Sequence, residues 1–208
     1  MKSKFMALAL ALASVLALAA CGDDSTTDTS STSSSSAAAN GVDRAFARSM
    51  IPHHRSAVDM ARIALEQGES RFVRGLASDI IRSQTAEIAT LTDRDRALAE
   101  RGIEVGSLGV SDDEMGMDHD AKTLDGAEAF DEAFIEMMVP HHRGAVVMAR
   151  AELAAGGDPE LKRLAEQIIA AQQGEIEAMR AHLGMPTSTD DSADPESTDS
   201  GGGGHSGH

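Results

Sequence analysis

One peptide occurs twice in this chain of 208 residues, at an offset of 88 residues. The first copy reads Met50-Ile-Pro-His-His-Arg-Ser-Ala-Val-Asp-Met-Ala-Arg62, and the second reads Met138-Val-Pro-His-His-Arg-Gly-Ala-Val-Val-Met-Ala-Arg150. Without any gap, residues 46–91 align with residues 134–179 at 20 identities in 46 positions. Repetition at a fixed period indicates a fold built from two copies of one unit. Each unit carries two histidines, a glutamine, a glutamate and several methionines.

Helix-favouring residues dominate the domain that we expect at residues 40–185. Trp and Tyr are absent, and the alternation typical of strands does not occur. Gly68 and Gly156 are predicted helix stops, and Asp158-Pro159 is a predicted helix start. The predicted fold is all-α, an antiparallel four-helix bundle made of two repeated helix hairpins with pseudo-two-fold symmetry. The predicted helices are 42–67, 71–101, 127–155 and 159–183, in repeats at about 43–101 and 127–184 joined by a linker at 102–126.

The two ends of the chain differ in composition from this domain. Residues 1–20 combine Lys2 and Lys4 with an apolar run that is too short for a membrane span, which predicts an export signal. The sequence Leu18-Ala-Ala-Cys21 resembles the lipobox of bacterial lipoproteins, so we expect a lipid on Cys21 and an anchor on the outer face of the cell membrane or on its periplasmic side. A plain secretory signal is the alternative. Residues 21–39 are a predicted flexible tether, and residues 186–208 a predicted disordered acidic tail that ends in a Gly/His-rich stretch.

Acidic residues outnumber basic residues by 34 to 18, and the net charge is −16 at pH 7. This balance argues against nucleic acid as a partner and favours cations. The sequence also lacks a phosphate-binding glycine loop and a dinucleotide fingerprint. A metal ion is therefore the expected partner, the membrane is expected to be reached through the lipid only, and no protein partner is indicated.

Both His-His pairs fall on the predicted buried stripe of their helix, with arginines on the opposite side. Pro52 and Pro140 precede the pairs, and each should kink its helix because proline lacks the N–H of a helical residue. On the second and fourth helices, a Gln-x-x-Glu set falls among apolar residues. A buried carboxylate is costly unless it is paired or bound to a metal, so we expect the imidazoles of the facing helices to be its partners.

These side chains together form a candidate metal site in the bundle core. Imidazole suits copper, zinc, iron and nickel, and thioether sulfur favours Cu(I), so copper is the favoured metal while iron and zinc stay open. In the alternative interpretation, the methionines fill the core and the His–Glu pairs are structural. The candidate ligands are His53, His54, Glu87, His141, His142, Glu175, Met50, Met60, Met138 and Met148, supported by Gln84 and Gln172.

A second candidate site lies in the linker, where Met115, Met117 and His119 follow a run of acidic residues. A solvated acidic loop is the alternative there, because flexible ligands bind with an ordering cost. His205 and His208 of the tail could bind a metal weakly.

The doubled Met-Ile/Val-Pro-His-His-Arg and Gln-x-x-Glu-Ile motifs resemble a bacterial ferritin-like family catalogued as domain of unknown function 305. The resemblance covers about residues 43–184. It implies a ferritin-like four-helix bundle that is often secreted or lipid-anchored, with copper binding in some members. Some members carry a longer Met/His-rich segment between the halves, which is short here. The positions that match the motif are His53, His54, Glu87, His141, His142 and Glu175.

Three functions compete at this point. The first is an exported, lipid-anchored protein that binds copper for sequestration or delivery. The second is a ferritin-like di-metal oxidoreductase, against which the two core carboxylates and the absence of Glu-x-x-His count. The third is an interaction module whose polar core only fixes the register of the helices. The sequence thus leans away from an enzyme.

Overall fold

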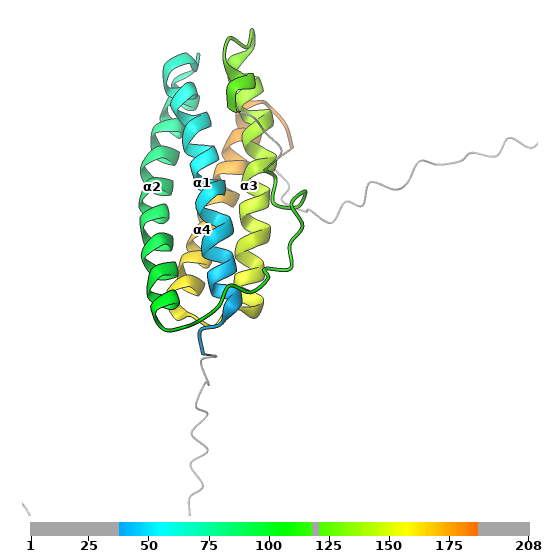
Figure 1. The fold of residues 1–208 in the computed structure, drawn as a ribbon. Helices are drawn as coiled ribbons and strands as arrows, with labels where there is room; N and C mark the ends of the chain where they lie inside the picture. Colours follow the sequence, from blue (N-terminus) through cyan, green and yellow to red (C-terminus); the bar gives the residue numbers. More distant parts are fainter. Residues whose placement is uncertain (1–37, 118–120, 187–208) are drawn as a thin grey trace, which may run out of the picture. The chain divides into compact units, whose positions relative to one another are not determined.

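The computed structural model describes residues 38–117 and 121–186, which form four long helices (Figure 1). No strand occurs within these two ranges, which confirms the all-α prediction. The helix α3 begins at Phe130 and not at residue 127, because Ala127 still donates a turn hydrogen bond to Leu124. The predicted signal segment with Cys21, and also His119, His205 and His208, lie outside the described residues. The elements are α1 (Gly41–Gln67), α2 (Arg71–Glu100), the short 3₁₀ helix η1 (Ala121–Leu124), α3 (Phe130–Ala155) and α4 (Pro159–His182).

The two hairpins, α1–α2 and α3–α4, meet mainly where α1 packs against α3 (Figure 1). Their core divides into two apolar clusters, which we name the Met60 cluster and the Met50 cluster. The Met60 cluster joins the second half of α1 to the first half of α3. The Met50 cluster joins the first half of α1 to the second half of α3, so the two helices are antiparallel. The Met60 cluster includes Met60, Val73, Leu76, Ile80, Phe134, Met138, Ile176 and Met179. The Met50 cluster includes Phe46, Met50, Leu91, Leu98, Met148, Leu161, Leu164 and Ile168.

Gly68 and Gly156 end α1 and α3, as the sequence predicts, but neither adopts the left-handed conformation. Their φ angles are −54° and −68°. Glycine leaves space at both positions: a Cβ on Gly68 would lie 2.5 Å from the Ala64 carbonyl oxygen, and one on Gly156 would lie 2.2 Å from Glu152 Oε1, so the Glu152 side chain would have to move. The tight turns that follow start α2 at the N-cap Ser70 and α4 at the N-cap Asp158.

Each hairpin turn is held by an aspartate from the other hairpin. Asp43 of α1 accepts hydrogen bonds of 2.8 Å from the backbone N–H groups of residues 157 and 158. Asp131 of α3 accepts hydrogen bonds of 2.7 and 2.8 Å from the backbone N–H groups of residues 69 and 70. Asp43 and Asp131 are themselves 88 residues apart, as are the two turns that they hold. The repeat therefore extends beyond its visible identities and closes both ends of the bundle reciprocally.

A pair of buried acids exists at only one of these ends. Asp43 and Glu152 are both 0% exposed, and the carboxyl of Glu152 faces that of Asp43. Burial, the hydrogen bond to Asp43 and repulsion from its charge raise the pKa of Glu152 to about 8. Burial also disfavours ionisation of Asp43, but hydrogen bonds from backbone N–H groups and from Glu152 hold its pKa below the usual value. Glu152 therefore carries the shared proton at neutral pH.

We expect this pair to lower the stability of the bundle as the pH rises. The folded state holds the proton of Glu152 up to a pH of about 8, whereas the unfolded chain releases it near 4.5. The contribution of this bound proton to the free energy of unfolding is thus complete below pH 4.5. It is lost progressively up to a pH of about 8, by at most ~1.4 kcal/mol per pH unit. Glu152→Gln should remove this slope in urea denaturation measured across that range. Glu166→Gln, at an exposed position of α4, is the control, and an unchanged slope in Glu152→Gln would contradict the account.

Candidate metal centre

The helices α1 and α3 continue through Pro52 and Pro140, so each His-His pair lies within an unbroken helix. The four imidazoles of His53, His54, His141 and His142 are buried, with exposed fractions of 0, 0, 1 and 0%. They form one polar layer, since the residues before and after them in each helix belong to different apolar clusters. The structure thus places all four rings in the interior, on the predicted stripe.

We call His54 and His142 the outer histidines of the layer, and His53 and His141 the inner histidines. Each outer histidine contacts a glutamate of its own hairpin. His54 Nε2 lies 2.7 Å from Glu87 Oε2, and His142 Nε2 lies 2.7 Å from Glu175 Oε2. The second contact also has hydrogen-bond geometry. The glutamates thus have the imidazole partners that we expect, although their side chains are still 18 and 21% exposed. They lie at the edge of the core, where water offsets part of the cost of their charge.

The inner histidines join the two hairpins. The rings of His53 and His141 are 3.8 Å apart between centroids, with their planes inclined by 35°. Within each helix, the ring of the inner histidine is 6.2 or 6.4 Å from that of the outer one. The layer is thus a continuous series that begins at Glu87, passes through the four rings and ends at Glu175.

Burial keeps His53 neutral. It lowers the pKa of this imidazole from 6.5 to about 3, and charge repulsion from His54 and His142 acts in the same direction. The backbone carbonyls of Met115 and His141 lie close enough to oppose this effect, although neither ring nitrogen of His53 has a well-formed hydrogen bond within the described residues. A neutral, poorly satisfied imidazole has a lone pair available for a cation.

Two amides extend the polar layer. Gln84 of α2 and Gln172 of α4 are 2 and 3% exposed. The side-chain oxygen of Gln84 and both polar side-chain atoms of Gln172 are buried without a hydrogen-bond partner among the described residues. Buried polar atoms normally have partners, so this layer is under-satisfied compared with an ordinary core.

The four candidate methionines are completely buried, but they fall on both sides of the histidine layer. Met60 and Met138 belong to the Met60 cluster, and Met50 and Met148 belong to the other. Of these four, each cluster therefore contains one methionine from each repeat, and the Met60 cluster also contains Met179. In the linker, Met115 is partly buried against the Met50 cluster, whereas Met117 is 37% exposed. These two methionines do not share one environment.

The donor set suits a soft cation in its chemistry, because it offers neutral nitrogen with thioether sulfur nearby. The donor atoms, however, do not converge on one point as they would in a preformed site. Within residues 38–117 and 121–186, no three His, Cys, Asp or Glu side chains converge closely enough to hold a metal ion. The inner pair, His53 and His141, brings together rings from both repeats, with centroids 3.8 Å apart.

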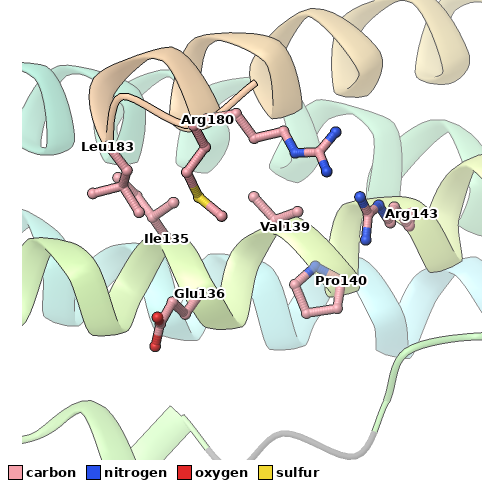
Figure 2. A pocket seen from close by; sticks show the side chains of 8 residues that line it. Ile135, Glu136, Val139, Pro140, Arg143, Arg180 and Leu183 are labelled. Atoms are coloured by element: carbon pink, nitrogen blue, oxygen red, sulfur yellow. The ribbon is translucent and has the colours of Figure 1, made fainter. Parts of the chain in front are cut away.

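Two surface grooves lie outside the histidine layer. One, of about 250 Å³, is formed by α3 and the end of α4, and Figure 2 shows Ile135 near Leu183 at one end of it and Arg143 at the other. The other, of about 330 Å³, lies over α1 and α2 and includes Arg55. None of the four buried histidines lines either groove, so neither is the candidate metal centre.

Fold and site together define a class of protein: a four-helix bundle with a buried layer of paired histidines contributed by two repeats. The model of the family described as domain of unknown function, DUF305, matches this chain over residues 43–183, with a further match over residues 20–95. The chain belongs to this family.

Solved structures of several proteins are similar to this chain. CopM in its Cu(I)-bound form is 33% identical, with a TM-score of 0.57 over 68% of this chain and 95% of CopM. A DUF305 fragment from Deinococcus radiodurans is 34% identical, with a TM-score of 0.57 over 70% of this chain and 97% of the fragment. A DUF305 protein from Streptomyces coelicolor, described as secreted, is 28% identical, with a TM-score of 0.59 over 69% of this chain and 93% of that protein. No match is found among the curated proteins.

Proposed function

We propose that this protein is an exported, lipid-anchored metal-binding protein that holds copper in its histidine layer, for sequestration or delivery. The observation that carries the proposal is the inner pair, His53 and His141. These rings come from both repeats, lie 3.8 Å apart and are buried, and burial keeps His53 neutral. Burial of the neutral His53 ring without a well-formed hydrogen bond is unfavourable, and a cation that accepts neutral nitrogen would satisfy it.

The related structures support the choice of metal. CopM has been solved in Cu(I)-bound, Cu(II)-bound and Ag-bound forms. Ag(I) and Cu(I) are both soft monovalent cations that prefer imidazole and thioether ligands. The buried methionines on either side of the layer supply such sulfur atoms. In this proposal His53 and His141 bind the ion, and His54 and His142, oriented by Glu87 and Glu175, complete or stabilise its environment.

Metal analysis of the mature protein, purified without added metal and then titrated with Cu(I), tests this function. The proposal expects stoichiometric copper, either as purified or after titration. Two bound irons would instead support a di-metal oxidoreductase. A protein that binds no metal even after titration would overturn the proposal and leave the polar layer with a structural role.

The proposed location can be tested separately at Cys21. The Streptomyces relative described as secreted supports export, and within the described ranges no helix is long and apolar enough to cross a membrane. Cys21→Ser should release the protein from the membrane fraction, because a lipid on Cys21 is the proposed anchor. Immunoblotting of membrane and soluble fractions would measure this, with Ser25→Ala as the control. Retention of Cys21→Ser in the membrane fraction would refute the lipid anchor.

A further inference from the structure

The linker between the hairpins crosses the bundle as a strap, which we define as residues 106–117 and which has turns at residues 112–116. Its first crossing is over the start of α1, where the backbone N–H of Gly106 donates a hydrogen bond of 2.8 Å to the carbonyl of Gly41. A Cβ on Gly41 would lie 2.9 Å from the nitrogen of Gly106. The strap and α1 are thus in direct backbone contact at a point where glycine occurs on both sides.

The second crossing lies over α3, beside its histidine pair. A Cβ on Gly144 would lie only 2.0 Å from the carbonyl oxygen of Met115, and a Cβ on Gly116 would lie 2.8 Å from the carbonyl oxygen of Pro140. Gly116 also has a φ of +64°, which favours glycine. Between the two crossings, Leu108 and Val110 are partly buried against the Met50 cluster, as is Met115.

The strap breaks the symmetry of the repeat. The position on α1 that corresponds to Gly144 is Ser56, which is only partly buried, whereas Gly144 is buried. The glycine therefore occurs in the copy of the motif over which the strap passes. The strap also reaches the inner histidines, because the Met115 carbonyl lies close to the ring of His53. On the opposite edges of the layer, Glu87 and Glu175 remain 18 and 21% exposed.

We propose that the strap is a cover that closes the bundle over the inner histidines, and that its opening controls the rate at which a soft cation reaches His53 and His141. The identity of the cation rests on the proposed function, whereas the role of the strap as a cover does not depend on it. Local segments held by few contacts open more readily than the helices that they cover. The strap has only its two crossings and a few partly buried apolar side chains to hold it.

Gly144→Ala is the sharpest test, because alanine favours a helix and would otherwise stabilise α3. The added Cβ must displace the strap. Overpacking of this size should raise the equilibrium constant for opening of the strap by about tenfold or more. Ser56→Ala, at the corresponding position of α1, is the matched control. In the metal-free mature protein, reaction with diethyl pyrocarbonate followed by mass spectrometry reports the exposure of His53 and His141. In a second arm, stopped-flow mixing with Ag(I) reports the rate of uptake.

The proposal expects His53 and His141 to react about tenfold faster or more in Gly144→Ala, with Ag(I) uptake faster by a similar factor. Unchanged histidine reactivity in a helical Gly144→Ala protein would overturn the cover, and faster reaction with unchanged Ag(I) uptake would overturn its control of access. If Gly144→Ala does not fold, the double change Leu108→Ala and Val110→Ala loosens the strap without altering α3 and decides the same question. Faster reaction with no Ag(I) uptake in any variant, the parent included, would support the cover and refute the proposed function.

Discussion

His54→Ala and His142→Ala should each weaken copper binding by at least ~100-fold, and the double variant should lose little more. The two positions are related by the repeat, and each ring contacts the glutamate of its own hairpin at 2.7 Å. They are joined only through the inner pair, whose rings are 3.8 Å apart. If the layer forms one shared site, either change disrupts the whole set. Competition titration with a Cu(I) chelator measures the affinity.

The same titration separates the alternatives. Two independent sites, one in each hairpin, would halve the stoichiometry in each single variant and leave the remaining affinity unchanged. His182→Ala, which alters an exposed histidine at the end of α4, should bind copper as the parent protein does. Parental affinity in the double variant would make the outer histidines structural. Any copper would then be bound by the inner pair, by linker residues 115–119 or by His205 and His208 of the tail.

His53→Leu should remove much of the loss of stability that we expect in acid. The unfolded chain takes up a proton on this imidazole near pH 6.5, whereas the folded protein does so only near 3. The contribution of neutral His53 to the free energy of unfolding is therefore complete above pH 6.5. It is lost as the pH falls toward 3, by up to ~1.4 kcal/mol per pH unit. Leucine fills a similar volume and does not titrate.

Urea denaturation of the metal-free protein, measured between these two pH values, gives the slope for parent and variant. Glu152 acts in the opposite direction above 4.5, so the difference between parent and variant isolates His53. His182→Leu at the exposed position is the control. An equal slope in the parent and in His53→Leu would show that His53 titrates in the folded state much as it does in the unfolded chain.

The repeat was sufficient to predict the bundle. Two copies of one peptide, each followed by a glycine stop and a second helical segment, leave little choice other than two antiparallel hairpins. Helical spacing also predicts that the four histidines lie in the interior, because His53 and His141 recur with large apolar residues at that spacing, and the structure places all four there.

Helical periodicity could not resolve the edges of the layer. It assigns a residue to a face within about one position, so Glu87 and Glu175 seemed buried although they lie at the rim of the core. It also placed the methionines on the histidine stripe without showing that they separate into two clusters. That separation depends on the antiparallel packing of α1 on α3, which brings Met60 to Met138 and Met50 to Met148.

The sequence gives weaker indications of the contacts between distant segments. Asp43 and Asp131 share the 88-residue offset and lie just before the aligned range, but nothing in the sequence shows that they hold the turns of the opposite hairpins. Glu152 corresponds to Ala64 in the other copy, so the repeat gave no reason to expect a buried acid pair. The difference between Ser56 and Gly144 was visible, but only the position of the linker shows that the glycine makes room for a crossing backbone.

The most direct test of the histidine layer as a copper site is the double variant His53→Leu and His141→Leu. These changes remove both inner rings and keep an apolar core of similar volume, so far-UV circular dichroism should still show a helical bundle. Copper bound to parent and variant is then counted by metal analysis after equilibration with excess Cu(I) and removal of the free ion. The account predicts stoichiometric copper in the parent and essentially none in the folded double variant. Equal copper in both proteins would contradict it.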